Sequence, residues 1–537
     1  MRPRHFRSLV SAFAICASLG LVVGLAAVAP DATAQDGKTV LRFVPHAGLR
    51  ITDPIMTTAY ISRNHGYMIY DTLFSVNDKF EPKPQMVEKY EVSPDKLTYT
   101  FTLRDGLKFH NGKPVTSEDC IASIKRWGQV DGMGLKLMST TKDMVAVNDK
   151  TFQIILKEPY GLVIDSLAKP SSNVPFIMPK EMADTPANKP VPDDIGSGPY
   201  RMVKSEFQPG VKVVYEKFAD YKPRSEPANS LSGGKVAKVD RVEWITMSDA
   251  QTATNALVKG EIDMIEQTSF DLLPELEKSK DITIKDLNPA GQQYMLRPNW
   301  LQPPLDNVKI RKVIMAAVNQ EDYLAAQVGN PKYYKVCHAM FGCGTPLATD
   351  AGAPTKHPSI AELKKMLKES GYKGEKIVIM APTDLLSIAQ LPLVTAPLLR
   401  EIGFNVDLQT MDWQTLVGRR AKKDPIDQGG WHIFHTSWYV ADLLNPIANA
   451  GVRGLGFGEG GWFGWSKDPE MEKLRNAYAA ETDPAKQKQI AAEVQKRAYD
   501  QVFFVPLGEV HLPSAFRKNV SGVLSTPAMA LWNIEKK

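Results

Sequence analysis

Two cysteines, Cys337 and Cys343, are the residues whose type and spacing most favour a chemical role. His338 lies between them, so the segment could hold a metal ion or close a small disulfide loop. Thiol clusters oxidise in exported proteins, and the N-terminus described below carries the marks of export. We therefore expect a Cys337–Cys343 disulfide and no metal site. Cys120 lies on an apolar stripe, which predicts a buried free thiol.

Motifs for catalysis or nucleotide binding are nearly absent. The sequence has no HExxH, GxSxG or Walker-type loop, and loop-like residues follow its one GxGxxG match, Gly456–Gly461, where a helix would be needed. His432 and His435 are three residues apart, but their segment predicts a strand, on which such side chains point to opposite faces. We therefore expect no catalytic residue, no metal ligand and no cofactor. The protein is predicted not to be an enzyme.

The composition is that of an ordinary globular protein. Of 537 residues, 43% are hydrophobic and 23% charged, which excludes a disordered or fibrous chain. The length suggests two to four compact units. A formal net charge of +5 is too small for a nucleic-acid-binding surface, so no such partner is expected.

Residues 1–34 have the pattern of a secretory signal. Arginines near the start precede an apolar stretch that Pro30 ends, and Ala32-Thr33-Ala34 is a small-residue cleavage site. An uncleaved membrane anchor is the alternative, because the apolar run is long enough to span a bilayer. We expect cleavage near Ala34 and an exported mature protein.

Strands and helices alternate along the rest of the chain. Residues 99–104 alternate apolar and polar side chains, Asp105-Gly106 can form a turn, and residues 107–109 resume the alternation, which predicts a hairpin. A capping-box pattern over Thr116–Asp119 then opens a helix that runs to Trp127.

Later segments continue this alternation. Asp306 and Asp483 are expected to begin two further helices, and residues 376–380 and 405–408 are expected to be strands. An alternation of this kind predicts an α/β protein built of lobes.

Several sequence blocks, taken in order, resemble a known family. They are Tyr70–Phe74, Leu97–Trp127, Gly196–Tyr200, Gly260–Asp263 and Pro303–Val308 with Arg311. Together they are similar to the extracellular solute-binding proteins, family 5, which serve peptide/nickel ABC transporters. The blocks cover about residues 40–520.

The resemblance implies a two-lobed periplasmic binding protein of the α/β class, with a hinge and a larger first lobe that carries an extra subdomain. We expect lobe I over residues 35–290, lobe II over 291–504, and a return to lobe I over 505–537. The implied function is that of a monomeric periplasmic component that delivers a captured solute to an inner-membrane ABC permease. The solute could be a peptide, an opine, a chelate or an organic cation. A secreted hydrolase or a protein-interaction module on similar lobes is the alternative.

One segment is the strongest candidate for ligand contact. Residues 437–446 resemble the family's GWxxDxxDP-type segment, where peptide-binding members place an Asp against the ligand's ammonium group. Asp442 matches that Asp, although a surface or helix-capping role is the alternative. Trp438 and Tyr439 precede it. An extra residue before Asp442, and Asn445 in place of the final acid, weaken the case for dipeptide specificity.

A second departure concerns the ligand's carboxylate. Dipeptide-binding relatives typically have an Arg in the loop after the first strand of lobe II, whereas residues 381–387 here hold no basic residue and contain Asp384. This predicts a positively charged solute with no carboxylate at that position, unless Asp384 faces solvent. Arg50 or Arg297 could supply a carboxylate partner from elsewhere.

Aromatic residues are expected to complete the cleft. Asn299-Trp300 follows the first predicted crossing between lobes, and Trp462 and Trp465 lie in a Gly-rich loop. Their rings could stack on an amphipathic solute, or each could pack in the core.

Overall fold

The computed structural model describes residues 37–537 apart from Glu459 and Thr482. The predicted signal, residues 1–34, and its cleavage site lie outside the described residues. Residues Thr39–Lys537 form one compact unit. Among the described helices, none combines the length and the apolar character that a bilayer crossing requires.

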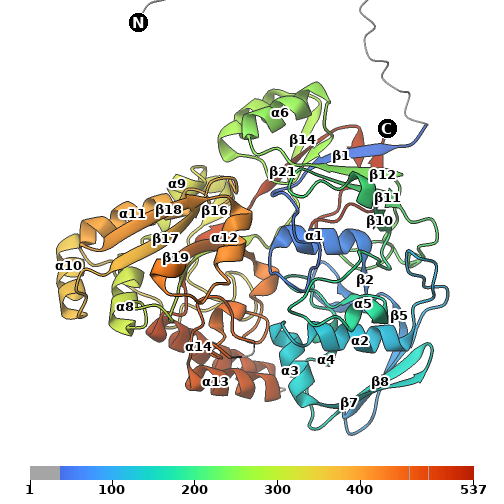
Figure 1. Ribbon diagram of the computed structural model, residues 1–537, viewed down its shortest axis with the longest axis horizontal. Coiled ribbons are helices and arrows are strands. Elements are labelled where there is room, and N and C mark those ends of the chain that lie inside the picture. The colour runs from blue at the N-terminus through green and yellow to red at the C-terminus, as the bar shows by residue number, and fades with distance from the viewer. Residues whose placement is uncertain (1–36, 459, 482) are drawn as a thin grey trace, which may run out of the picture. The chain divides into compact units, whose positions relative to one another are not determined.

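The first of two large sheets has seven strands (Figure 1). In spatial order they are β10 (Tyr200–Met202), β11 (Lys212–Lys217), β12 (Arg241–Ile245), β1 (Val40–Val44), β13 (Met264–Ile265), β21 (Pro513–Arg517) and β14 (Ile282–Asp286). Strand β1 runs parallel to β12 and β13, and the other pairs are antiparallel. The α6 helix (Ala250–Lys259) contacts β13 and β21.

The second sheet has six strands. Their order is β16 (Tyr334–Lys335), β20 (Val505–Val510), β15 (Gln292–Pro298), β19 (Ile433–Tyr439), β17 (Lys376–Pro382) and β18 (Asn405–Met411). Strand β17 is parallel to both of its neighbours. Four helices accompany this sheet on the left of Figure 1: α8 (Val308–Ala317), α9 (Gln320–Gln327), α10 (Ile360–Glu369) and α11 (Leu391–Ile402).

Two short connections join the sheets. The chain leaves the seven-stranded sheet after Asp286 and enters the six-stranded sheet at Gln292. It returns between Val510 and Pro513. Two sheets joined in this way form the expected two-lobed α/β architecture. The residue boundaries predicted for the lobes stay a prediction.

A four-stranded antiparallel sheet forms the extra subdomain of the first lobe. Its order is β5 (Val87–Val92), β6 (Thr98–Leu103), β8 (Thr151–Leu156) and β7 (Thr141–Asn148). The α2 helix (Ser117–Trp127) packs on β7 and β8. The remaining elements are α1 (Tyr60–Ile69), β2 (Asp71–Thr72), β3 (Phe74–Val76), β4 (Pro82–Pro84), α3 (Gly132–Thr140), α4 (Val163–Leu167), β9 (Phe176–Ile177), α5 (Lys180–Ala183), α7 (Leu273–Lys278), α12 (Trp413–Arg419), α13 (Pro469–Ala480), α14 (Pro484–Gln501), β22 (Val520–Ser521) and β23 (Glu535–Lys536).

Two predicted helix starts are confirmed in atomic detail. Thr116 and Asp119 form a reciprocal capping box before α2. Asp483 accepts hydrogen bonds from the backbone N–H groups of Ala485 and Lys486 at the start of α14. These side chains satisfy donors that the first helical turn leaves without partners.

Two local predictions are wrong. Residues 107–109 do not pair with β6, because Phe109 donates its N–H to Lys113 and Val115 donates to Leu107, which closes a separate loop. Strand β6 pairs with β5 and β8 instead. Asn307, rather than Asp306, caps α8.

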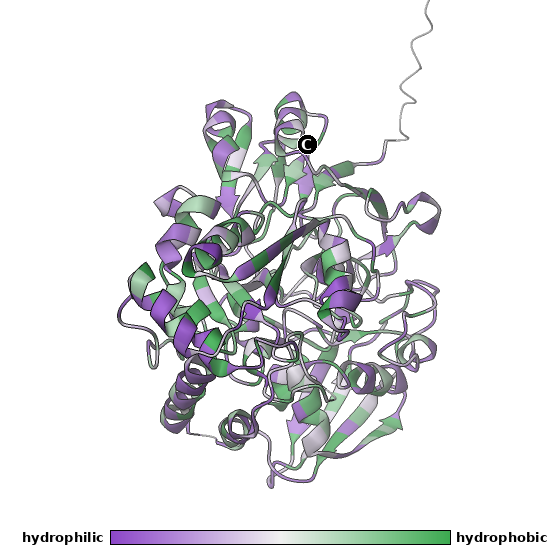
Figure 2. Ribbon diagram, turned by 60° about the vertical axis from the view of Figure 1, so that its left-hand side comes forward, coloured by the Kyte–Doolittle hydropathy of each residue, from purple (hydrophilic) through white to green (hydrophobic). Residues whose placement is uncertain are grey.

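The core is continuous across most of the compact unit. Trp127, Trp244, Trp431 and Trp532 are each fully buried. Outer helices carry hydrophobic and hydrophilic residues together (Figure 2). In α10, for example, Leu363 and Leu367 are buried while the intervening lysines face solvent. This amphipathic pattern fixes which side of each helix packs on its sheet.

Candidate functional site

The candidate site is a cavity of about 250 Å³ between the edges of the two lobes. First-lobe residues that line it include His46 after β1, Gln267 after β13, and Asp271 in the 3-10 turn Phe270–Leu272. Second-lobe residues come from the end of α9 and from the loop that precedes α11, including Asp384 and Gln390. Ligand sites of α/β proteins commonly form at such places, where loops at strand ends meet.

A smaller inner cavity of about 30 Å³ adjoins this one. The two cavities share His46, Gln267 and Ser387 as lining residues. Tyr60 and Gln292 also line the inner cavity, which draws its walls from both lobes. A solute that extended from the outer cavity into the inner one would therefore contact both lobes.

The inner cavity contains a buried arginine that the sequence analysis missed. Arg420, at the end of α12, is only 2% exposed and lines this cavity. Its Nη2 donates to Thr58 Oγ1 at 3.2 Å, across the two lobes. Burial lowers the pKa of Arg420 to about 10. In the sequence Arg420 belongs to the basic run Arg419-Arg420-Ala421-Lys422-Lys423, which resembles a solvated surface.

His46, which lines both cavities, is paired with a buried carboxylate. His46 Nδ1 lies 2.7 Å from Glu266 Oε2, and Asn64 donates to Glu266 Oε1 at 2.9 Å. Burial raises the pKa of Glu266, but the adjacent His46 outweighs this and the net pKa is lowered. The negative charge of Glu266 is thus already matched inside the protein.

Asp442 belongs to a network between the lobes. It lies in a short 3-10 turn after β19 (Val440–Asp442) and is 2% exposed. Tyr60 and Ser171 each donate a hydroxyl hydrogen bond to Asp442 Oδ2 at 2.8 Å. Lys169 Nζ lies 3.9 Å from Asp442 Oδ1. Burial raises the pKa of Asp442 against the opposing charges of Lys169 and Arg63.

Tyr439 stands beside this network. Its ring packs edge-on against Tyr60 with centroids 4.5 Å apart, and the Arg63 guanidinium lies 4.4–4.5 Å from both rings. The backbone N–H of Tyr439 donates to Tyr60 Oη at 2.8 Å. Folding therefore brings Tyr60 into contact with Tyr439 and with Asp442, which lies 382 positions later in the chain.

Other predicted contacts are dispersed. Asp384 lines the 250 Å³ cavity and accepts a hydrogen bond from the Trp413 backbone at 2.6 Å. Asn445 lines a separate cavity of about 60 Å³ and accepts hydrogen bonds from the N–H groups of Ile447 and Ala448. Arg50 is exposed and lies 3.5 Å from Asp412, a contact between the lobes.

Three of the predicted aromatic residues lie near one another. Trp438 lines the inner cavity and packs edge-on against Trp462, with centroids 4.7 Å apart. Trp462 lines another cavity, of about 630 Å³, between loops of both lobes. Trp465 packs against buried Trp431, with centroids 6.0 Å apart. Trp438 is thus the one of the three that borders the inner cavity.

Two predicted positions lie in the packed interior of the second lobe. Asn299 is fully buried and donates to the Trp431 carbonyl. Trp300 packs against Arg311 and Phe503. Arg297, the alternative carboxylate partner, donates to the backbone carbonyls of Gly451, Phe463 and Phe503. Its Nε and Nη1 therefore donate to the backbone, whereas its Nη2 is buried without an acceptor among the described residues.

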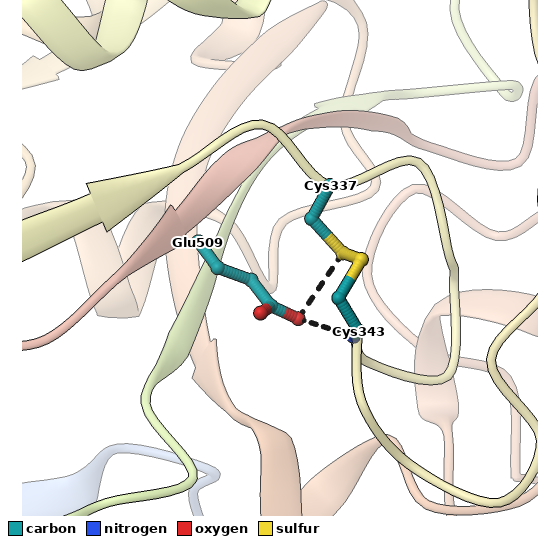
Figure 3. Close-up of side chains that lie close together, drawn as sticks. All are labelled: Cys337, Cys343 and Glu509. Atoms are coloured by element: carbon teal, nitrogen blue, oxygen red, sulfur yellow. Dashed lines mark hydrogen bonds between the residues drawn. A yellow bond between two sulfur atoms is a disulfide. The ribbon is translucent and has the colours of Figure 1, made fainter.

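The predicted disulfide between Cys337 and Cys343 is confirmed (Figure 3). Glu509 of β20 accepts a hydrogen bond from the Cys343 N–H at 2.7 Å, and its Oε1 lies 3.2 Å from Cys337 Sγ. Cys120 is a buried free thiol, also as predicted.

Comparisons with known proteins point to one family. The family model described as bacterial extracellular solute-binding proteins, family 5 Middle, matches residues 81–453. The probable peptide ABC transporter periplasmic-binding protein y4tO of Sinorhizobium fredii (strain NBRC 101917 / NGR234) is 41% identical, over 96% of this chain and 98% of that protein. The glutathione-binding protein GsiB of Salmonella typhi is 26% identical, over 95% and 96%.

A solved structure shows the same fold. The structure of AgaA from A. tumefacien R10, in complex with agropinic acid, aligns with a TM-score of 0.76 at 21% identity. The alignment covers 93% of this chain and 99% of AgaA.

Proposed function

The chain belongs to the bacterial extracellular solute-binding proteins, family 5, and from this premise we propose that it captures a peptide or a peptide-like small solute between its lobes. As a member of this family it is the substrate-binding component of an ABC importer, so an inner-membrane permease receives the solute. The similar proteins support the solute class, since y4tO is a probable peptide-binding protein and GsiB binds glutathione.

The observation that carries the proposal is the pair of adjoining cavities lined by both lobes. A ligand that contacts His46 and Gln267 on one side and Ser387 and Gln390 on the other would stabilise the arrangement in which those residues face each other. The two short connections, residues 287–291 and 511–512, supply the hinge for this movement.

The remaining parts of the proposal concern place and assembly. We propose that the signal over residues 1–34 directs the protein to the periplasm, where it acts as a monomer. Periplasmic proteins similar to this chain support that location. No turnover of the solute is part of the proposal, which separates it from the hydrolase alternative.

Native mass spectrometry of the exported protein tests the proposal. The expected spectrum shows one chain, without its first 34 residues, and a small molecule that denaturation releases intact. A released peptide or peptide-like compound supports the proposed class. A released opine outside that class, a metal chelate or a hydrolysed product would contradict it.

If denaturation releases no bound molecule, the proposal is tested next by thermal unfolding with a peptide library. A ligand at a hundred times its dissociation constant should add about 2.7 kcal/mol to the free energy of unfolding. Stabilisation by no member of the library would refute the peptide proposal.

A further inference from the structure

The Cys337–Cys343 disulfide lies against a buried carboxylate. Glu509 of β20 is fully buried, and Figure 3 shows its carboxylate facing the two sulfurs. The two sulfurs and one Glu509 oxygen all lie within 4.8 Å of one another. A disulfide sulfur carries no proton, so Cys337 Sγ cannot donate a hydrogen bond to Glu509 Oε1, 3.2 Å away, while the pair is oxidised. Part of the capacity of this carboxylate is therefore unused beside the disulfide.

Two buried oxygens next to the disulfide lack hydrogen-bond donors. Glu509 Oε2 lies 2.9 Å from Lys335 Nζ, on a half-exposed side chain, but it makes no hydrogen bond with any described residue. Gln293 Oε1, on the neighbouring strand β15, is likewise buried with no donor among the described residues. The Gln293 side-chain nitrogen lies 3.7 Å from Cys337 Sγ, which places this side chain at the disulfide. Buried acceptors without donors are costly, so the surroundings favour a cation.

Neighbouring elements hold the two sulfurs close together independently of the S–S bond. The Cys343 N–H donates to Glu509 at 2.7 Å, and β15, α9 and α14 hold the rest of the segment by its backbone. Those hydrogen bonds run from the Cys337 N–H to Gln320 at 2.8 Å, from Gln293 to the Ala339 carbonyl at 2.8 Å, from the Met340 N–H to Gln495 at 3.0 Å and from Tyr499 to the His338 carbonyl at 2.7 Å. Reduction would therefore leave a preorganised pair of thiols.

The reduced cluster has the composition of a zinc ligand set. Zinc binds thiolate sulfur at about 2.3 Å and carboxylate oxygen at about 2.0–2.2 Å, usually with four ligands. The Cα atoms of Cys337 and Cys343 are 5.9 Å apart, so their side chains can turn to put the sulfurs roughly 3.8 Å apart, as on a tetrahedral ion. Two thiolates, the Glu509 carboxylate, the Lys335 ammonium and a divalent ion together carry no net charge.

We propose that reduction of the disulfide creates a metal site, in which Cys337, Cys343 and Glu509 bind one zinc ion or another thiophilic divalent cation, with water as the fourth ligand. The expectation of no metal site was made for the oxidised pair, and the site exists only in the reduced protein. The metal then closes the same short loop that the disulfide closes. The loop lines neither the outer nor the inner cavity, so the site is independent of solute capture.

A dithiol is the reductant. Cys337 is buried, whereas Cys343 is partly exposed and precedes exposed Gly344, so the attacking thiolate forms a mixed disulfide with Cys343 Sγ. Cys337 leaves and takes up a proton. The second thiol of the reductant then displaces Cys343, which is also protonated, and the reductant becomes a disulfide. Two electrons and two protons have passed to the pair. A divalent ion then forms two metal–sulfur bonds and releases both thiol protons.

Metal titration of oxidised and reduced protein tests the site. The exported protein is reduced with a water-soluble phosphine, which is removed without oxygen, and zinc affinity is measured by competition with a chromophoric chelator. Reduced wild type is expected to bind one zinc ion per chain at least about 100-fold more tightly than oxidised wild type. Zinc should raise its melting temperature by at least about 2 °C, and cadmium should give the ultraviolet band of sulfur-to-metal charge transfer.

Variants separate this site from other metal-binding groups. Reduced C337S/C343S is expected to lose the tight site and the cadmium band. Reduced E509Q keeps both thiols and should bind zinc at least about tenfold more weakly. Two controls should match reduced wild type: C120A, which removes the buried free thiol, and E493Q, which removes an exposed carboxylate of α14.

Equal zinc affinity in the oxidised and reduced wild type, or tight binding retained in C337S/C343S, overturns the metal site. Undiminished affinity in E509Q overturns the role of Glu509 as a ligand. If a variant fails to fold, alkylation of the reduced wild type decides the question: zinc should protect Cys337 and Cys343 from iodoacetamide, and unprotected thiols would refute the site. Solute affinity, measured on the same samples, tests the proposed function separately.

Discussion

Buried polar side chains in this protein differ in how completely their neighbours satisfy them. Asp442 has two hydroxyl donors and a nearby lysine, whereas the described part of the chain gives the His435 side chain a single hydrogen-bond partner, Thr395, at 2.7 Å. The ionisation of such groups is set by burial more than by sequence neighbours. Their titration therefore gives two tests of the local geometry.

Replacing Asp442 with Asn should change how stability depends on pH. Burial raises the pKa of Asp442 in the folded protein, so the folded state holds a proton that the unfolded state releases above about pH 4. Wild-type stability therefore falls as the pH rises through this window. D442N keeps an acceptor for Tyr60 and Ser171 but does not titrate.

Urea unfolding at pH 4 and pH 7 measures this effect. The free energy of unfolding of D442N, relative to wild type, is expected to be greater at pH 7 than at pH 4, by about 1.4 kcal/mol for each unit of pKa shift. A relative stability that decreased with pH would show that the charged carboxylate is favoured in the folded state.

Replacing His435 with Gln should reduce the loss of stability in acid. Burial lowers the pKa of His435 to about 3, so below about pH 6.5 the unfolded chain binds a proton that the folded protein excludes. The wild type then loses up to about 4 kcal/mol between pH 6.5 and pH 3. H435Q should lose less over this range, and H357Q, at an exposed position, should follow the wild type.

Sequence reasoning identified residue types better than residue partners. The segment of Asp442 is recognisable in the sequence, and its contact with a ligand stays a prediction. Tyr60, Ser171 and Lys169 lie in distant parts of the chain, and only folding brings them to Asp442. Arg420 was not predicted as a site residue, because the basic residues around it are typical of an exposed surface. Hydrophobic periodicity reports which face of an element is buried, and it does not report a polar side chain enclosed between lobes.

Secondary-structure elements were predictable where the signal was local. The capping box before α2 and the Asp-Pro start of α14 depend on residues a few positions apart. The predicted hairpin of residues 99–109 is wrong because strand pairing depends on partners far along the chain, and β6 pairs with β8. The disulfide was predictable since its two cysteines lie in one short segment.

Removing the disulfide should lower stability while leaving binding intact. Its loop closes over a sequence separation of six residues, for which the loss of unfolded-state entropy corresponds to about 2 kcal/mol. The C337S/C343S variant should lose that amount in urea unfolding. The segment lines neither the outer nor the inner cavity, so solute affinity should be unchanged.

Reduction provides the matching control. Wild-type protein treated with dithiothreitol should unfold at the same urea concentration as the double variant. A large loss of affinity in the variant would instead place the loop in the ligand site.

At the scale of the whole molecule, closure depends on contacts that cross between lobes. Tyr60 connects α1 to the end of β19 through two hydrogen bonds of 2.8 Å. Tyr67, on the same helix, donates instead to the Pro170 carbonyl within the first lobe. Variants at these two tyrosines therefore distinguish an effect on lobe closure from an effect on packing within one lobe.

Y60F should weaken solute binding about 5- to 30-fold, because two buried polar groups lose a partner worth about 1–2 kcal/mol in the closed arrangement. Y67F should leave affinity within about threefold. Calorimetry gives the affinities, and small-angle X-ray scattering follows compaction on ligand addition. Equal losses in both variants would show that general packing, rather than closure, is affected.

The order of strands in the seven-stranded sheet also bears on how the chain is made. Strand β21 lies between β13 and β14, yet the ribosome makes it only after every strand of the six-stranded sheet. The seven-stranded sheet therefore lacks the strand between β13 and β14 until synthesis is nearly finished. Non-local strand pairing of this kind slows folding. Such a delay suits the proposed export, in which the polypeptide is threaded through a secretion channel before it folds.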